Sequence, residues 1–155
     1  MFTSGKLPSD FIVGGQFFLY SEIKKGTAEM WKKFQNNPCG RNVGDCAVRA
    51  VSVALGVDWE TAFIMLAFNA LQMCDMPSSD AVWGSVLRQS GFVRHAIDNT
   101  CPDCYTAEDF CKDHPQGVFV LGFGGHVACI VDGILFDSWC SLQNVPQFFW
   151  ELKEE

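Results

Sequence analysis

The sequence predicts a single α+β domain in which helices come first and an antiparallel β-sheet follows. Helical spacing of apolar residues dominates up to about residue 91, and alternating, β-branched and aromatic residues dominate from residue 92 onward. The chain has 155 residues, 48% of them hydrophobic, enough for one substantial core but not for two. Helices followed by a run of strands are typical of α+β folds.

The predicted domain spans residues 1–155 and divides into a helical segment over 1–36, further helices over 37–91 and a β-sheet over 92–155. The first helix is expected from about Ser21 to Phe34, before the breaker run 36–38. Three more follow: Cys46 to Leu55 with Gly56 as its stop, Trp59 to about Cys74 with Asp58 as its N-cap, and a helix that Ser79 caps and Gly91 ends.

Four strands and one short helix are expected in the last part of the chain. The strand candidates cover residues 117–123, 126–131, 134–139 and 147–150. Thr106 and Asp109 form a capping pair for the short helix, and Phe110 is expected to turn inward. The sheet is therefore expected to be antiparallel and to carry most of the aromatic residues of this half.

The dipeptide Asp132-Gly133 is the strongest local signal for a hairpin, because a two-residue turn needs positive φ at both positions. If Val131 faces Ile134 across the turn, Ala128 faces Asp137. His126 is then a diagonal neighbour of Asp137 on the same face, with the two backbones about 7–8 Å apart. A carboxylate at this position can accept a hydrogen bond from the imidazole and fix its tautomer.

A cysteine stands at the predicted helix start that follows the loop 39–45. The N–H groups and the positive end of the helix macrodipole stabilise a thiolate at Cys46, and an imidazole can take its proton. The order Cys46, His126, Asp137 therefore indicates a cysteine nucleophile, a histidine base and an orienting carboxylate. Burial of Cys46 as a small core residue is the alternative interpretation.

The segments Gly44-Asp45-Cys46 and Gly125-His126-Val127-Ala128, with Asp137 on the next strand, resemble the papain-like cysteine peptidases in their small microbial and phage versions. The likeness covers about residues 39–150, and bacteriocin-processing and NlpC-type cell-wall peptidases are similar in layout. The resemblance implies a papain-like fold whose nucleophile helix packs on the C-terminal sheet. It also implies hydrolysis of a peptide or isopeptide bond through an acyl-enzyme, with no cofactor.

The chain departs from this family at the oxyanion hole. Papain-like enzymes usually place a glutamine about six residues before the nucleophile, where this chain has Gly40. The remaining candidates are the Asn42 side chain and the backbone N–H of Cys46. Two alternatives stay open beside hydrolysis: an inactive papain-like domain that binds or inhibits a protein, and an acyltransferase or amidase on the same triad.

A second cluster combines Cys101 and Cys104, in a Cys-x-x-Cys pair, with Cys111 and His114. These four donors are weak candidates for a zinc site, and a disulfide or free thiols are the alternatives. The eight cysteines are not expected to form a disulfide framework, because such frameworks belong to short secreted chains with small cores.

The formal charge of −7 and the pI of about 4.8 exclude a general nucleic-acid or anionic-membrane binder, which needs a basic surface. No run approaches the ~20 apolar residues of a membrane span, and the first residues do not read as a signal peptide. We therefore expect a cytoplasmic protein whose partner is a peptide or protein substrate.

Overall fold

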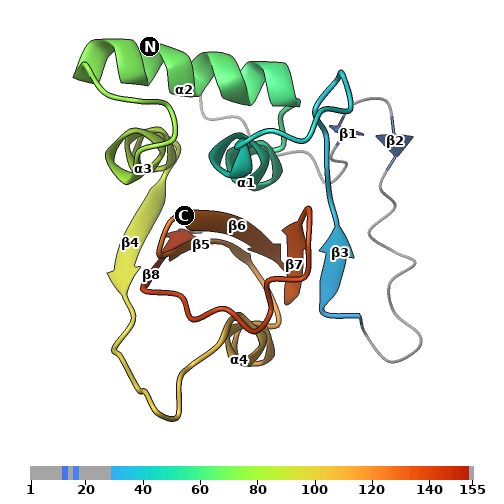
Figure 1. Ribbon diagram of the computed structural model, residues 1–155, viewed down its shortest axis with the longest axis vertical. Helices are drawn as coiled ribbons and strands as arrows, with labels where there is room; N and C mark the ends of the chain where they lie inside the picture. The colour runs from blue at the N-terminus through green and yellow to red at the C-terminus, as the bar shows by residue number, and fades with distance from the viewer. Residues whose placement is uncertain (1–11, 14–15, 18–28, 154–155) are drawn as a thin grey trace.

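The computed structural model describes residues 12–13, 16–17 and 29–153. In these residues the chain forms four helices and a six-stranded open mixed sheet, so the predicted α+β class is confirmed (Figure 1). The helices are α1 (Cys46–Leu55), α2 (Trp59–Met73), α3 (Asp80–Gln89) and α4 (Ala107–Asp113). Helices α1 and α3 cover one face of the sheet, α2 lies outside them, and α4 covers the opposite face (Figure 1).

The six-stranded sheet has the strand order β3-β7-β6-β5-β8-β4. Its strands are β3 (Trp31–Lys33), β4 (Phe92–Ala96), β5 (Val118–Phe123), β6 (His126–Val131), β7 (Ile134–Asp137) and β8 (Phe148–Leu152). Strands β4 to β8 pair antiparallel, as predicted, while β3 runs parallel to β7 at one edge. A separate antiparallel pair joins β1 (Ile12–Val13) to β2 (Gln16–Phe17).

The predicted helix from Ser21 to Phe34 is wrong in its described part, because residues 31–33 form strand β3. The Leu135 N–H donates to the carbonyl of Met30 at 2.8 Å, and the Phe34 N–H donates to the carbonyl of Asp137 at 2.7 Å. Pairing with β7 thus satisfies backbone groups that a helix would have bonded internally.

The wider prediction of a helical segment over 1–36 is also wrong wherever the structure assigns secondary structure there. Residues 12–13, 16–17 and 31–33 are all strands. Residues 21–28 of the predicted helix lie outside the described residues.

The other predicted helices are confirmed, and side-chain caps explain where α2, α3 and α4 begin. The Asp58 carboxylate accepts the Thr61 N–H at 2.7 Å at the start of α2. Ser79 caps α3 in the same manner, and Thr106 with Asp109 forms a reciprocal capping box at α4. Gly56 ends α1 with a φ of 65°, a left-handed conformation that glycine adopts without strain.

Two apolar clusters form the core, one on each face of the sheet. On the α1 and α3 face, Val51, Leu66 and Trp83 pack against Val120 and Cys129 of the sheet, all of them fully or almost fully buried. The opposite cluster, under α4, contains Phe110, Leu121, Ile130 and Leu135.

The small residues Ala47, Ala50 and Ala54 let α1 approach β6 closely, and this brings the start of α1 next to the start of β6.

The hairpin between β6 and β7 has the predicted register. Asp132 and Gly133 have φ values of 49° and 74°, as a two-residue turn of this kind requires. Val131 pairs with Ile134, and the register continues through Ile130 and Cys129 toward the end of β7. The turn therefore determines that Asp137 ends β7 beside the first residues of β6.

Helix α2 has an unusually apolar outer surface. Ile64, Phe68 and Leu71 are 66%, 58% and 77% exposed, and the Phe63 ring stacks on Trp59. Among the described residues, no single helix is both long and apolar enough to cross a membrane, and α1 with α2 meets that test only as a pair bent by 111°.

Candidate active site

Three elements bring Cys46, His126 and Asp137 together. Cys46 is the first residue of α1, His126 is the first of β6, and Asp137 is the last of β7. His126 Nε2 lies 2.6 Å from Asp137 Oδ2, and the Cys46 sulfur is hydrogen-bonded to the same imidazole. Since Asp137 engages Nε2, Nδ1 is the ring nitrogen that remains for the sulfur.

The Asp137 carboxylate is buried and held by donors on both oxygens. Oδ2 also accepts the Ser141 hydroxyl at 2.6 Å, and Oδ1 accepts the Ser138 N–H at 2.7 Å. Burial raises the pKa of Asp137, but the hydrogen bonds from His126 and Ser141 outweigh burial and bring that pKa below its ordinary value. The carboxylate is therefore ionised at neutral pH and can stabilise an imidazolium.

The environment of His126 favours its protonated form. Burial lowers the pKa of His126, whereas the hydrogen bonds to Asp137 and Cys46 and the charges of both raise it more, to about 9. The imidazole consequently carries a proton on both nitrogens at neutral pH.

The pKa of the Cys46 thiol shifts downward, in the opposite direction to that of His126. Burial raises the pKa of Cys46, but the hydrogen bond and charge of His126, the Val127 N–H and the Arg49 charge together bring it below its ordinary value. Burial without such partners raises the pKa of Cys111 to about 11 and raises that of Cys129 as well. The directions of the two pKa shifts, downward for Cys46 and upward for His126, both favour a thiolate–imidazolium pair.

The start of α1 offers free backbone donors beside the sulfur. Asp45 occupies the N-cap position, but its side chain accepts no hydrogen bond from the helix backbone. Within the part of the chain that the structure describes, the N–H groups of Cys46, Ala47 and Val48 have no acceptor. Such donors at a helix N-terminus can stabilise an oxyanion.

The loop before α1 contains the other oxyanion candidate, Asn42. Its side chain is exposed and accepts or donates no hydrogen bond among the described residues. Asn37 shapes this loop, because its Oδ1 accepts the N–H groups of Cys39 at 3.0 Å and Arg41 at 3.4 Å. Gly40, six residues before Cys46, has a φ of 62° in this turn.

Arg49 belongs to the site although sequence reasoning missed it. This side chain is 6% exposed and lies between two buried carboxylates: it pairs with Asp45 Oδ1, and its Nη2 lies 3.5 Å from Asp137 Oδ1. The other oxygen of Asp45 accepts the Trp59 indole N–H at 2.9 Å. An arginine among small apolar residues, four residues after an aspartate, was the available signal.

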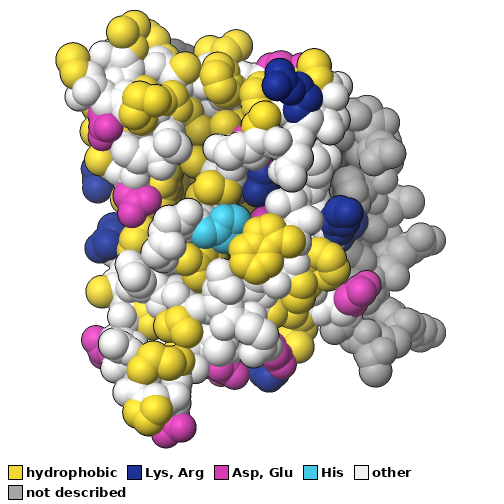
Figure 2. Space-filling model, viewed as in Figure 1, with side chains coloured by type: hydrophobic (Ala, Val, Ile, Leu, Met, Phe, Trp, Pro, Cys, Tyr) yellow, Lys and Arg dark blue, Asp and Glu magenta, His cyan; other side chains and the backbone are white. Residues whose placement is uncertain are grey.

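Aromatic rings flank the imidazole of His126 and cover part of it. The His126 ring centre lies 5.8 Å from that of Phe123 and 5.3 Å from that of Trp139. Trp139 is 46% exposed, so it lies at the surface of the site and offers an apolar contact to a bound molecule. Figure 2 shows one histidine side chain at the surface with hydrophobic side chains directly beside it.

The predicted zinc candidates are wrong as a group. Cys101 and Cys104 form a disulfide, which removes both as thiolate ligands. Cys111 is buried in α4, and the His114 ring stacks on Phe110 with its Nδ1 3.1 Å from the Phe110 carbonyl. The described residues contain no group of three or more His, Cys, Asp or Glu side chains arranged to hold a metal ion.

Comparisons of the chain with models of protein families, with curated proteins and with solved structures found no match.

Proposed function

We propose that this protein is a papain-like thiol hydrolase that cleaves a peptide or isopeptide bond with Cys46, His126 and Asp137. One observation carries the proposal: His126 is hydrogen-bonded on one side to a buried carboxylate, at 2.6 Å, and on the other to a thiol whose pKa is lowered. A nucleophile, a base and an orienting group connected in this order are the requirements of covalent acyl transfer.

In the first half of the reaction the Cys46 thiolate attacks the carbonyl carbon of the scissile amide. The carbonyl oxygen becomes an oxyanion, which the free N–H groups at the start of α1 are positioned to stabilise. The His126 imidazolium then donates its Nδ1 proton to the amine as the C–N bond breaks. The products of this half are a thioester on Cys46 and a free amine.

In the second half a water molecule hydrolyses the thioester. Neutral His126 takes a proton from the water, the resulting hydroxide attacks the thioester carbon, and the C–S bond breaks. Cys46 leaves as a thiolate and His126 keeps the proton, so the ion pair is restored. Asp137, ionised and bonded to Nε2, stabilises the imidazolium in both halves.

The arrangement of elements supports the papain-like form of the proposal. The helix that begins at Cys46 packs on the sheet whose adjacent antiparallel strands carry His126 and Asp137. The resemblance of the Cys and His segments to that superfamily implies the same arrangement. The helix N–H groups supply oxyanion donors where the usual glutamine is replaced by Gly40.

Incubation of the protein with a proteome-derived peptide mixture tests the proposal, with cleavage measured by mass spectrometry of new termini. The wild type should create new termini, and Cys46→Ala and Cys46→Ser should create none. Hydroxylamine added to the reaction should intercept the thioester and convert part of the acid product into a hydroxamate. Preferential amide products with an added amine would indicate acyl transfer.

Equal product patterns for wild type and Cys46→Ala would contradict catalysis by Cys46. Retention of a biological effect and of a bound partner by Cys46→Ala would then favour a protein-binding domain on this fold. The Cys74→Ser variant is a matched control, because Cys74 is an exposed thiol at the end of α2, and it should cleave like the wild type.

A further inference from the structure

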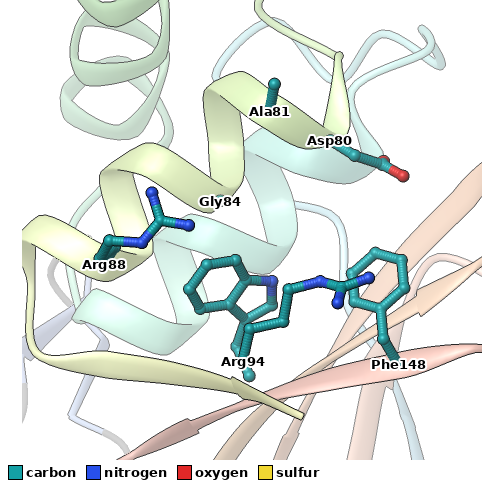
Figure 3. Close-up of a pocket in the computed structure, with 7 residues that line it drawn as sticks. Asp80, Ala81, Gly84, Arg88, Arg94 and Phe148 are labelled. Carbon is teal, nitrogen blue, oxygen red and sulfur yellow. The ribbon is translucent and has the colours of Figure 1, made fainter. Parts of the chain in front are cut away.

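A pocket of about 230 Å³ lies between α3 and the strands β8 and β4, apart from the three catalytic candidates. Its helix wall includes Asp80, Gly84 and Arg88, and its sheet wall includes Arg94 and Phe148 (Figure 3). The lack of a side chain at Gly84 leaves space for the Trp150 ring, which also lines the pocket, because a Cβ at Gly84 would lie 2.8 Å from that ring.

Two arginines give this pocket its chemical character. The Arg94 guanidinium lies 4.1 Å from the centre of the Phe148 ring, and that of Arg88 lies 5.4 Å from the centre of a Trp150 ring. Neither forms an ion pair with a carboxylate of the described residues. A guanidinium held over an aromatic face keeps its N–H edge available for a planar anion.

One carboxylate, Asp80, also lines the pocket, but it is used within α3. Its Oδ1 accepts the indole N–H of Trp83 at 3.1 Å. Figure 3 shows Asp80 and Arg88 at opposite ends of the helix wall. The two arginines thus give the pocket a net positive charge on a protein whose formal charge is −7.

The sheet register relates the pocket to Cys46. Phe148 pairs with Gly122, Gly122 pairs with Val127, and the Val127 N–H is hydrogen-bonded to the Cys46 sulfur. Phe148 and Cys46 also belong to the same apolar cluster, on one face of the sheet. Two strand spacings separate β6 from β8, which is about 10 Å. An extended peptide covers that distance with roughly three residues.

We propose that this pocket is a substrate subsite for a carboxylate, about three residues from the scissile bond. The carboxylate belongs either to an Asp or Glu side chain of the substrate or to its C-terminus, since both present the planar group that a guanidinium fork binds in bidentate fashion. The inference rests on the proposed hydrolase function, because the distance is counted from Cys46.

Binding of fluorescent peptides to full-length Cys46→Ala tests the subsite without cleavage. The probes are a peptide library with Glu or Gln at each position in turn, each peptide made with a free or an amidated C-terminus. We expect Glu to bind about tenfold more tightly than Gln at one position, the size of one charge-assisted hydrogen bond. Tighter binding of only the free-acid peptides would identify the C-terminus as the source instead.

Arg88→Gln and Arg94→Gln, added separately to Cys46→Ala, should each abolish most of this preference. Both side chains are exposed, so these variants should fold like the parent, which circular dichroism checks. Lys33→Gln is the control, because it removes the same charge from an exposed position on β3, at the opposite edge of the sheet.

The binding and cleavage experiments distinguish failure of the subsite proposal from failure of the hydrolase proposal. If the wild type cleaves peptides but neither Glu nor a free C-terminus changes binding, the subsite proposal is overturned while the hydrolase stands. If the preference appears and depends on Arg88 and Arg94 but the wild type cleaves nothing, the pocket binds carboxylates and the hydrolase proposal is overturned. An unchanged preference in both arginine variants also overturns the subsite.

Discussion

The guanidinium of Arg49 lies 3.5 Å from the carboxylate of Asp137, and this contact joins helix α1 to the end of strand β7. Both side chains are buried, at 6% and 2% exposure. The helix that supplies the nucleophile is thus tied to the strand that supplies the orienting carboxylate. Arg49 is a positioning residue, because it contacts Asp137 and adds positive charge near the Cys46 sulfur.

Replacing Arg49 with methionine should raise the pKa of Cys46, because the Arg49 charge is one of the causes that lower it. The midpoint of the pH profile for alkylation of Cys46 should therefore move to higher pH. The variant should also lose about 3–5 kcal/mol of stability, since Asp45 and Asp137 lose the charge between them. Alkylation followed by peptide mass spectrometry, and urea unfolding, measure the two effects.

The conservative variant Arg49→Lys separates charge from packing. It keeps the positive charge, so its alkylation midpoint should stay close to that of the wild type even if its stability falls. A purely structural Arg49 would give both variants the wild-type midpoint in their folded fractions.

Asp137→Asn should narrow the pH range of activity from its alkaline side. The reactive pair needs Cys46 deprotonated and His126 protonated, so activity rises through the pKa of Cys46 and falls through that of His126, which is about 9. The neutral amide of this variant lacks the charge that raises the pKa of His126, so the alkaline limb of kcat/KM should move from about pH 9 toward the ordinary histidine range. The maximum should also fall, by on the order of 10² or more.

The matched control for Asp137→Asn is Asp113→Asn, at an exposed carboxylate at the end of α4. Its profile should keep both limbs of the wild type. An alkaline limb that stays near pH 9 in Asp137→Asn would show that another group determines it.

Gly122→Ala should destabilise the protein, because a Cβ at this position would lie 2.2 Å from the Phe148 ring. Phe148 is buried in the core cluster, so its ring must shift or the strands must separate, at a cost of about 1–3 kcal/mol. Gly124→Ala is the control, because its Cβ would have only ordinary contact with Gln147. Thermal unfolding of the two variants should show a lower Tm for Gly122→Ala alone.

The elements with local signals were predictable from the sequence. Asp58, Ser79 and Thr106 identify helix starts because their side chains bond backbone N–H groups three residues later. The Asp132-Gly133 turn determines a register, and the register alone placed Asp137 beside His126. Local chemistry was enough at these positions.

The wrong prediction for residues 31–33 and the missed role of Arg49 both involve contacts between residues far apart in the sequence. Residues 31–33 were expected to be helical because Met30, Trp31 and Phe34 have helical spacing, but their hydrogen-bond partners lie on β7, about a hundred residues later along the chain. The Arg49 contact with Asp137 joins positions 88 residues apart. Neither pairing leaves a periodic pattern in a single sequence.

The Cys101 and Cys104 pair shows a different limit of sequence reasoning. A Cys-x-x-Cys segment is compatible with zinc binding, a disulfide or free thiols, and only the positions of the other donors decide among them. The disulfide and the stacking of His114 on Phe110 keep these side chains from converging.

The rate of Cys46 alkylation by iodoacetamide at pH 6 tests the thiolate–imidazolium pair most directly. The folded wild type should alkylate Cys46 much faster than the exposed thiols Cys39 and Cys74, although Cys46 is the less exposed, because His126 lowers the pKa of Cys46 and so increases its reactive thiolate fraction. His126→Ala should remove the advantage. Equal rates for Cys46 and the exposed thiols at pH 6, or a Cys46 rate unchanged by His126→Ala, would contradict the proposed site.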